Sequence, residues 1–129
     1  AESPENPRNV VVLATVKGDI HDIGKNIIKV LLENYNFHVI DLGKDVPTED
    51  IVNAVKKHDA KLVVLSALMT TTVANMKTTI EMLREQNLQC KVMVGGAVLN
   101  SAYAKMIGAD YYGKNAWEAV NIAKRIYNK

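Results

Sequence analysis

The stretch NVVVLATVKGDIHDIGKN, residues 9–26, decides the fold of this chain. Its first part, residues 9–16, is a continuous apolar run rich in β-branched side chains, as expected of a strand buried on both faces of a sheet. Residues 17–24 then alternate glycine, acidic and histidine residues, and apolar side chains recur at helical spacing from Gly24 to Tyr35. A buried strand, a polar loop and an amphipathic helix in succession predict a βα unit.

The same alternation repeats to the end of the chain. Short apolar runs predict strands at residues 37–42, 61–66, 90–94 and 110–112, and amphipathic stretches predict helices from Pro47 and over residues 72–86, 101–107 and 115–127. Successive βα units predict an α/β fold, namely a flavodoxin-like or Rossmann-like, doubly wound, five-stranded parallel sheet in the order 2-1-3-4-5. In that order the topological switch lies between strands 1 and 3, and a ligand is expected outside their carboxyl ends.

Composition excludes several classes of protein. Hydrophobic residues make up 48% and charged residues 23% of the chain, which is ordinary for one globular domain. A net charge of +2 from scattered basic residues gives no basis for binding nucleic acid or a membrane surface, and no apolar run is long enough to cross a bilayer. The single cysteine, Cys90, fits a reducing cytoplasm. We expect residues 1–8, which contain two prolines, to be a linker or the end of a longer chain, and residues 9–129 to be the domain.

The loop of residues 17–24 contains a candidate metal ligand, His21, with Asp19 two residues before it. An imidazole that binds a metal through one nitrogen usually donates its other N–H to a carboxylate, which fixes the tautomer. A solvated histidine beside a helix-capping Asp22 explains the loop equally well. The other histidines, His38 and His58, stand at the ends of predicted elements and are expected to be structural, which argues against a four-ligand zinc site.

Two further loops are predicted at the same edge of the sheet. Residues 66–72, SALMTTT, contain more hydroxyl groups than a helix cap needs, although at least one of the threonines is expected to cap the next helix. Residues 95–97, GGA, allow close approach of backbone to a bulky ligand, although paired glycines are also common in turns.

Taken together, the three loops resemble the signature DxHxxG, SxL, GG of the base-off/His-on cobalamin-binding family. Here the signature reads Asp19-Ile20-His21-Asp22-Ile23-Gly24, then Ser66-Ala67-Leu68 after the intervening residues 25–65, then Gly95-Gly96 after residues 69–94. Residue identity and spacing both match, and the resemblance extends from about Val10 to Tyr127.

The resemblance implies cobalamin as cofactor, with its nucleotide tail buried beside the strands. It implies that His21 is the lower ligand of cobalt, that Asp19 orients the imidazole, and that Thr72, where methionine synthases have serine, completes a proton relay. The residues that it places at the cofactor are Gly18, Asp19, Ile20, His21, Asp22, Ile23, Gly24, Ser66, Leu68, Met69, Thr70, Gly95, Gly96, Ala97 and Ala116. Proton uptake by the Asp19–His21 pair when the lower ligand leaves cobalt is a hypothesis of the same kind.

Within the family, this sequence looks like the methyltransferase branch. Mutases usually follow the histidine with Asp-Arg-Gly, whereas this chain has Asp22-Ile23-Gly24 and also resembles that branch at residues 41–43 and 46–47. Small corrinoid proteins of methanogens and acetogens fit slightly better than the cobalamin domain of methionine synthase. The implied function is to carry a methyl group on cobalt between a donor and an acceptor of homocysteine, tetrahydrofolate or coenzyme M type.

Such a module does not catalyse the reaction alone. The implied partners are methyl-donor and methyl-acceptor methyltransferase proteins or domains, a reductive activator, and a helical cap expected upstream in a longer chain. The alternatives are a corrinoid sensor or chaperone without turnover, and an adenosylcobalamin mutase subunit. A response-regulator-like domain is disfavoured because its acidic phosphoacceptor cluster is missing from the expected loops, and an FMN protein because no phosphate-binding loop follows the first strand.

Overall fold

A computed structural model describes residues 9–128 of the chain as an α/β domain. The strands are β1 (Val10–Val16), β2 (His38–Val46), β3 (Leu62–Ser66), β4 (Lys91–Gly95) and β5 (Tyr111–Tyr112), and the helices are α1 (Ile23–Asn34), α2 (Thr48–His58), α3 (Thr70–Glu85), α4 (Ser101–Met106) and α5 (Ala116–Tyr127). The segment 1–8, expected to be a linker, lies outside the described residues. No helix among residues 9–128 is long and apolar enough to cross a membrane.

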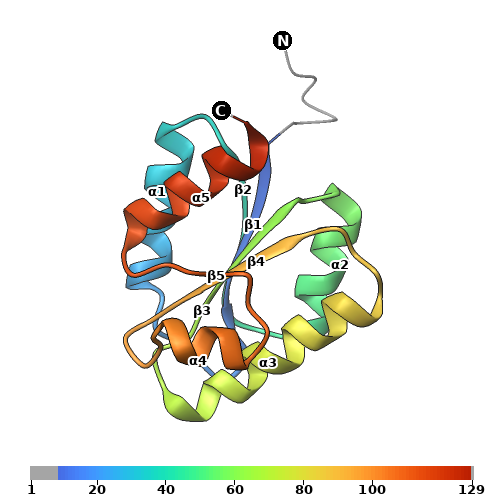
Figure 1. The fold of residues 1–129 in the computed structure, drawn as a ribbon, viewed down its shortest axis with the longest axis vertical. Coiled ribbons are helices and arrows are strands. Elements are labelled where there is room, and N and C mark those ends of the chain that lie inside the picture. Colours follow the sequence, from blue (N-terminus) through green and yellow to red (C-terminus); the bar gives the residue numbers. More distant parts are fainter. Residues whose placement is uncertain (1–8, 129) are drawn as a thin grey trace.

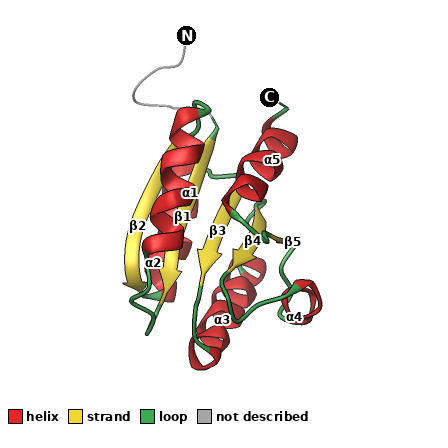
Figure 2. Cartoon of the chain, turned by 90° about the vertical axis from the view of Figure 1, so that its left-hand side faces the viewer, coloured by secondary structure: helices red, strands yellow, loops and turns green. Residues whose placement is uncertain are grey.

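The predicted sheet is confirmed. The strands form one parallel sheet in the order β2-β1-β3-β4-β5. Figure 1 shows α1 and α5 on one side of this sheet and α2, α3 and α4 on the other. The arrowheads of β1, β2, β3 and β4 in Figure 2 point to the same edge, so the loops that carry the predicted motifs gather there.

The side chains of the strands divide between two cores because their direction alternates along each strand. Val11 and Leu13 of β1 face α1 and α5, whereas Val10 and Val12 face α2 and α3. Every residue of β1 is buried, which explains why all of its side chains except that of Thr15 are apolar instead of alternating with polar ones. Strand β1 lies between β2 and β3 and supports the loop that follows it.

Strand β2 is longer than predicted. The sequence predicted that this strand ends at Leu42, but pairing with β1 continues to Val16↔Val46 and contains two register shifts. At each shift β2 has one extra residue, so the segment remains in the sheet although its pairing is irregular.

The prediction that a threonine caps α3 is wrong. The residue at the N-cap position is Met69, which makes no side-chain cap bond, and Thr70, Thr71 and Thr72 lie in the first helical turn. Asp22 stands at the N-cap of α1 but also makes no cap bond. At the start of α3, the carboxylate of Asp19 from the β1–α1 loop accepts hydrogen bonds from the amides of Leu68 and Met69.

Candidate functional site

The Asp19 carboxylate is fully buried between the β1–α1 loop and the start of α3. Its Oδ2 accepts hydrogen bonds from the Leu68 amide (2.7 Å), the Met69 amide (3.4 Å) and the Thr72 hydroxyl (2.7 Å). Its Oδ1 accepts from the backbone N–H of His21 at 3.0 Å and lies 2.7 Å from the Nδ1 atom of the same residue. One side chain thus connects the two loops that the sequence singled out.

This environment keeps Asp19 ionised. Burial by itself would raise the pKa of the carboxyl group, but hydrogen bonds from the Leu68 and His21 amides, the Thr72 hydroxyl and the His21 ring outweigh it. They hold the pKa of Asp19 well below its ordinary value of 3.8. A negative charge near the first turn of α3 also interacts favourably with the helix dipole.

His21 is consequently oriented through one ring nitrogen only. An ionised carboxylate cannot donate, so the Nδ1 atom of His21 carries the proton that it shares with Asp19. The imidazole side chain is 45% exposed, in contrast to the buried Asp19. In this tautomer the Nε2 lone pair is available to an external ligand or metal.

Exposed apolar side chains lie in the loops that meet at Asp19. Ile20 is 64%, Ile23 78% and Leu68 44% exposed, and Met69 is also partly open to solvent. A cluster of exposed apolar side chains usually marks a surface that binds a ligand or a partner.

A row of side chains that become smaller across the sheet opens a space beside this surface. At the carboxyl edge, Thr15 of β1 is in register with Ser66 of β3, and Ser66 with Gly95 of β4. The Thr15 hydroxyl donates to the carbonyl oxygen of His21 (3.4 Å) and lies 3.2 Å from the Ser66 hydroxyl. Gly95, at the end of the row, has no side chain to fill the layer beneath α1 and α5.

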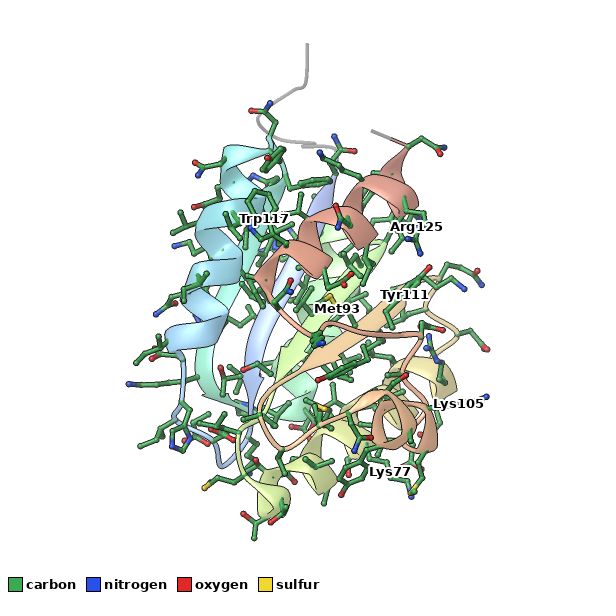
Figure 3. The ribbon with its side chains drawn as sticks, turned by 60° about the vertical axis from the view of Figure 1, so that its left-hand side comes forward. Lys77, Met93, Lys105, Tyr111, Trp117 and Arg125 are labelled. Carbon is green, nitrogen blue, oxygen red and sulfur yellow. The ribbon has the colours of Figure 1, made fainter. Side chains whose placement is uncertain are left out.

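The space is a cavity of about 540 Å³. It runs from the β1–α1 loop to the segment between β5 and α5, and Met93, labelled in Figure 3, lies in it near the start of α5. Its lining comprises residues 20–25, Ile27, Ile28, residues 65–68, Met93, residues 95–97 and residues 112–116. Apart from a few polar groups, these side chains are apolar, as is usual for a small-molecule site.

Gly96 is required by the fold at the edge of this cavity. Its φ is +137°, and a Cβ atom there would lie 1.8 Å from the carbonyl oxygen of Ala67. Gly24 differs, because a Cβ atom at Gly24 would have no heavy atom within 4 Å. These two of the three signature glycines are therefore under different steric constraints.

The structure gathers most of the predicted site residues around the cavity. Those that line it are Ile20, His21, Asp22, Ile23, Gly24, Ser66, Leu68, Gly95, Gly96, Ala97 and Ala116. Asp19 and Thr72 lie behind His21, and the Met69 amide contacts Asp19. Gly18 donates to Asp45 instead of lining the cavity, and Thr70 is exposed and is not part of the lining.

Sequence reasoning missed several residues of the site. Thr15, Lys25, Met93, Tyr112 and Lys114 were not predicted as site residues. Register could have identified Thr15 and Met93, because alternate residues near the end of a buried strand face the same layer. Nothing local in the sequence marks Tyr112 or Lys114.

The described part of the chain contains no group of three or more His, Cys, Asp or Glu side chains placed to hold a metal ion. A metal at His21 would therefore have fewer than three ligands among the His, Cys, Asp and Glu side chains of the described residues. That arrangement suits a metal whose other ligands come from its own organic ring.

Comparisons with known proteins agree with this geometry. Residues 9–121 match the family described as B12 binding domain. The chain is 47% identical over 124 residues to dimethylamine corrinoid protein 3 of Methanosarcina acetivorans, in a match that covers 95% of this chain and 58% of that protein. The chain thus spans little more than half the length of this curated relative.

Solved structures are similar as well. A cobalamin-binding protein from Desulfitobacterium hafniense superposes with a TM-score of 0.87 at 41% identity, covering 90% of this chain and 58% of that one. The methanol:cobalamin methyltransferase complex of Methanosarcina barkeri contains a chain that superposes with a TM-score of 0.89 at 37% identity, covering 92% of this chain and 46% of that one.

Proposed function

The chain belongs to the B12 binding domain family, and on that premise we propose that it holds its corrinoid with His21 as the lower ligand of cobalt and the nucleotide tail in the cavity. The family confirms the expectation of a cobalamin-type cofactor. The mode of binding, base-off and His-on, is the part that we propose. The observation that carries it is the 2.7 Å contact between His21 Nδ1 and Asp19 Oδ1, in a loop where His21 also lines a largely apolar cavity.

The cavity fits a nucleotide tail in size and shape. Its volume of about 540 Å³ lies within the range of about 300–1,000 Å³ that is typical of small-molecule sites. Ser66 and Gly95 line it, and a Cβ atom on Gly95 would lie 3.3 Å from the carbonyl oxygen of Gly113, which also lines it. The glycine therefore keeps the slot open where a flat aromatic base would enter.

The surface above the cavity fits the corrin ring. Ile20, Leu68 and Met69 are exposed and apolar, and they belong to the loops that meet behind His21. A broad, largely apolar macrocycle lying over them would remove this area from water and place its metal over the imidazole.

When bound, such a corrinoid supplies a cobalt centre that can carry a methyl group. The residues of this chain bind and orient. His21 offers Nε2, and Asp19, kept ionised by its hydrogen bonds, holds Nδ1–H and so fixes the ring. The Thr72 hydroxyl donates a hydrogen bond to Asp19 Oδ2 and so helps to hold the carboxylate beside His21.

We infer that the chain is the methyl-carrying module of a methyltransferase system. The similarity to a dimethylamine corrinoid protein and to a chain of a methanol:cobalamin methyltransferase complex supports this role. A methylated amine or methanol is the donor class that these relatives favour, and the acceptor is a thiol or pterin nucleophile. The donor and acceptor sites belong to methyltransferase partners, with a reductive activator and a helical cap completing a cytoplasmic system.

The direct test of the lower ligand is His21→Ala in protein loaded with cobalamin. We expect a His-on absorption spectrum in the parent chain and a base-off spectrum in the variant, with the corrinoid still bound through its tail. His38→Ala is the matched control, because His38 lies at the opposite, amino-terminal end of β2. Identical spectra for the parent chain and His21→Ala would show that another group is the lower ligand.

The role as a methyl carrier needs a separate test. The loaded chain is mixed with a methylamine or methanol methyltransferase, and methylation of the bound corrinoid is followed by its absorption. We expect methylation to depend on the methylated substrate and on the reduced corrinoid. Tight binding without any methylation by either class of partner would favour a sensor or chaperone, and a preference for adenosylcobalamin would favour a mutase subunit.

A further inference from the structure

The second half of β2, residues 41–46, is irregular and lies beside the β1–α1 loop, which contains His21. Its pairing with β1 shifts register between Leu13 and Ala14 and again between Ala14 and Val16, so β2 contains extra residues at both places. Asp45 has a φ of +52°, a left-handed conformation that few residues adopt. Bulges often re-aim side chains beside functional sites, and both carboxylates of this segment point to residues of the loop.

Asp45 holds the start of the loop by two reciprocal bonds. The Gly18 amide donates to Asp45 Oδ1 at 2.8 Å, and the Asp45 amide donates to the carbonyl oxygen of Asp19 at 2.9 Å. Asp45 therefore fixes the backbone of Asp19, whose side chain orients His21.

Asp41 holds the far end of the loop through Lys25. The Lys25 ammonium group, 2% exposed, lies 2.8 and 2.9 Å from the two carboxylate oxygens of Asp41 and 2.7 Å from Asn26 Oδ1. Lys25 is in the first turn of α1, four residues after His21. Asp41 Oδ1 also accepts from the Gly43 amide at 2.9 Å, which stabilises the first bulge.

These features are costly for the fold alone. A left-handed backbone is unfavourable for a residue with a side chain, and a buried ion pair gains little after desolvation. A cation in the first turn of α1 is also at the unfavourable end of the helix dipole. The left-handed Asp45 contacts the start of the β1–α1 loop, and the Lys25–Asp41 ion pair lies just after its end. This placement suggests that these unfavourable features are retained because they hold the loop.

We propose that Asp41 and Asp45 are positioning residues for His21, and this inference rests on the proposed function. They fix the two ends of the β1–α1 loop, so that the imidazole stands ready to coordinate cobalt before the corrinoid arrives. Loss of either contact makes the loop mobile and lowers the ratio of His-on to His-off corrinoid, while the tail remains in its cavity.

Asp45→Gly isolates the side-chain bond. Glycine keeps the positive φ and the backbone bond to Asp19 and removes only the acceptor of the Gly18 amide. Asp59→Gly is the matched control, because Asp59 also has a left-handed φ of +49° but lies at the carboxyl end of α2 and is 88% exposed. Asp45→Asn keeps an acceptor oxygen and should rescue the function. Asp41→Asn tests the other end of the loop.

Two measurements decide the proposal. In protein loaded with Co(II) cobalamin, the nitrogen splitting of the electron paramagnetic resonance signal reports the His-on fraction. We expect the ratio of His-on to His-off to fall about tenfold in Asp45→Gly, as for the loss of one hydrogen bond of about 1.4 kcal/mol. In cofactor-free protein, we expect amide exchange at Gly18 and His21 to accelerate about tenfold. Asp41→Asn should shift both in the same direction, and Asp59→Gly and Asp45→Asn should shift neither.

A His-on ratio in Asp45→Gly and Asp41→Asn equal to that in Asp59→Gly would overturn the inference, whatever the exchange rates. Absence of the nitrogen splitting in the parent chain would instead refute His21 as the lower ligand. The exchange rates separate these failures, because they report the bracing of the loop without any cofactor.

Discussion

At the scale of the residue, the Asp19 carboxylate is the group on which the site depends. It accepts hydrogen bonds from two amides that precede α3, from the Thr72 hydroxyl and from both the backbone and the ring of His21. A buried carboxylate with this many donors stabilises the fold and orients the metal ligand at the same time. Substitution therefore has consequences that can be measured without any cofactor.

Asp19 makes the free energy of unfolding of the domain depend on pH in the acid range. Because its pKa in the folded chain lies below the ordinary value of 3.8, the unfolded chain binds the proton more tightly. The stabilisation is fully present above about pH 5 and is lost as pH falls through about 4 and below. Asp19→Asn should lower the free energy of unfolding at pH 7 by about 1–3 kcal/mol and flatten its decline in acid.

Urea unfolding at pH 7, 5, 4 and 3 measures this effect, and the curves of the parent chain and Asp19→Asn should converge at low pH. Asp59→Asn is the control, because Asp59 is exposed and should leave the acid profile unchanged. Parallel profiles for the parent chain and Asp19→Asn would contradict the assignment.

Two of the signature glycines, Gly96 and Gly24, should separate effects on stability from effects on binding. Gly96→Ala places a Cβ atom against the Ala67 carbonyl oxygen in an unfavourable backbone region and should destabilise the fold by about 2–5 kcal/mol. Gly24→Ala meets no neighbour within 4 Å and lies in α1, so stability should be unchanged or rise by up to about 1 kcal/mol. Because Gly24 lines the cavity, its variant should still bind corrinoid less tightly.

Urea denaturation and corrinoid titration of both variants test this separation. A Gly24→Ala protein that binds corrinoid as the parent chain does would mean that the glycine is not needed for the ligand. A stable Gly96→Ala protein would mean that the Ala67 backbone can move away.

At the scale of the element, β2 and α3 show how one loop is assembled from several parts of the chain. Helix α3 begins without a side-chain cap of its own, and Asp19 from the β1–α1 loop accepts hydrogen bonds from the Leu68 and Met69 amides, which precede the helix. Strand β2 departs from regular pairing, and its carboxylates meet the two ends of the same loop. The β1–α1 loop is thus held on one side by β2 and on the other by the segment that follows β3.

At the scale of the whole molecule, the site follows from the order of the strands. Strands β1 and β3 are neighbours, but their following helices α1 and α3 lie on opposite faces of the sheet (Figure 1). Their loops diverge at the carboxyl edge, which leaves room for a ligand at the switch point. The cavity then continues beneath α1 and α5, because the row Thr15, Ser66 and Gly95 does not fill that layer.

Ligand binding should therefore stabilise the whole domain. At a cobalamin concentration of about 100 times Kd, linkage predicts a gain of about 2.7 kcal/mol, or a rise in Tm of roughly 5–10 °C for a domain of this size. Cobinamide, a corrinoid without the nucleotide tail, should give a clearly smaller rise. Thermal unfolding followed by circular dichroism measures both, and equal shifts would show that the tail does not occupy the cavity.

Much of this protein follows from its sequence alone. Local apolar patterns predicted every strand and helix, and the right-handed crossover of parallel strands then allowed few arrangements besides the observed order. The position of His21, Asp19, Ser66 and Gly95 at one edge follows from that order. Such features are predictable because they depend on neighbours along the chain and on general rules of handedness.

Only the tertiary structure decided how the site is held. Four features join residues distant in sequence: the contact of Asp45 with Gly18, the burial of Lys25 against Asp41, the hydrogen bonds from Leu68 and Thr72 to Asp19, and the place of Met93 and Tyr112 in the cavity lining. The extension of β2 past Leu42 likewise depends on the hydrogen bonds that β1 offers it. Local propensity disfavours several of these arrangements, and they exist because packing and hydrogen bonding across the sheet outweigh it.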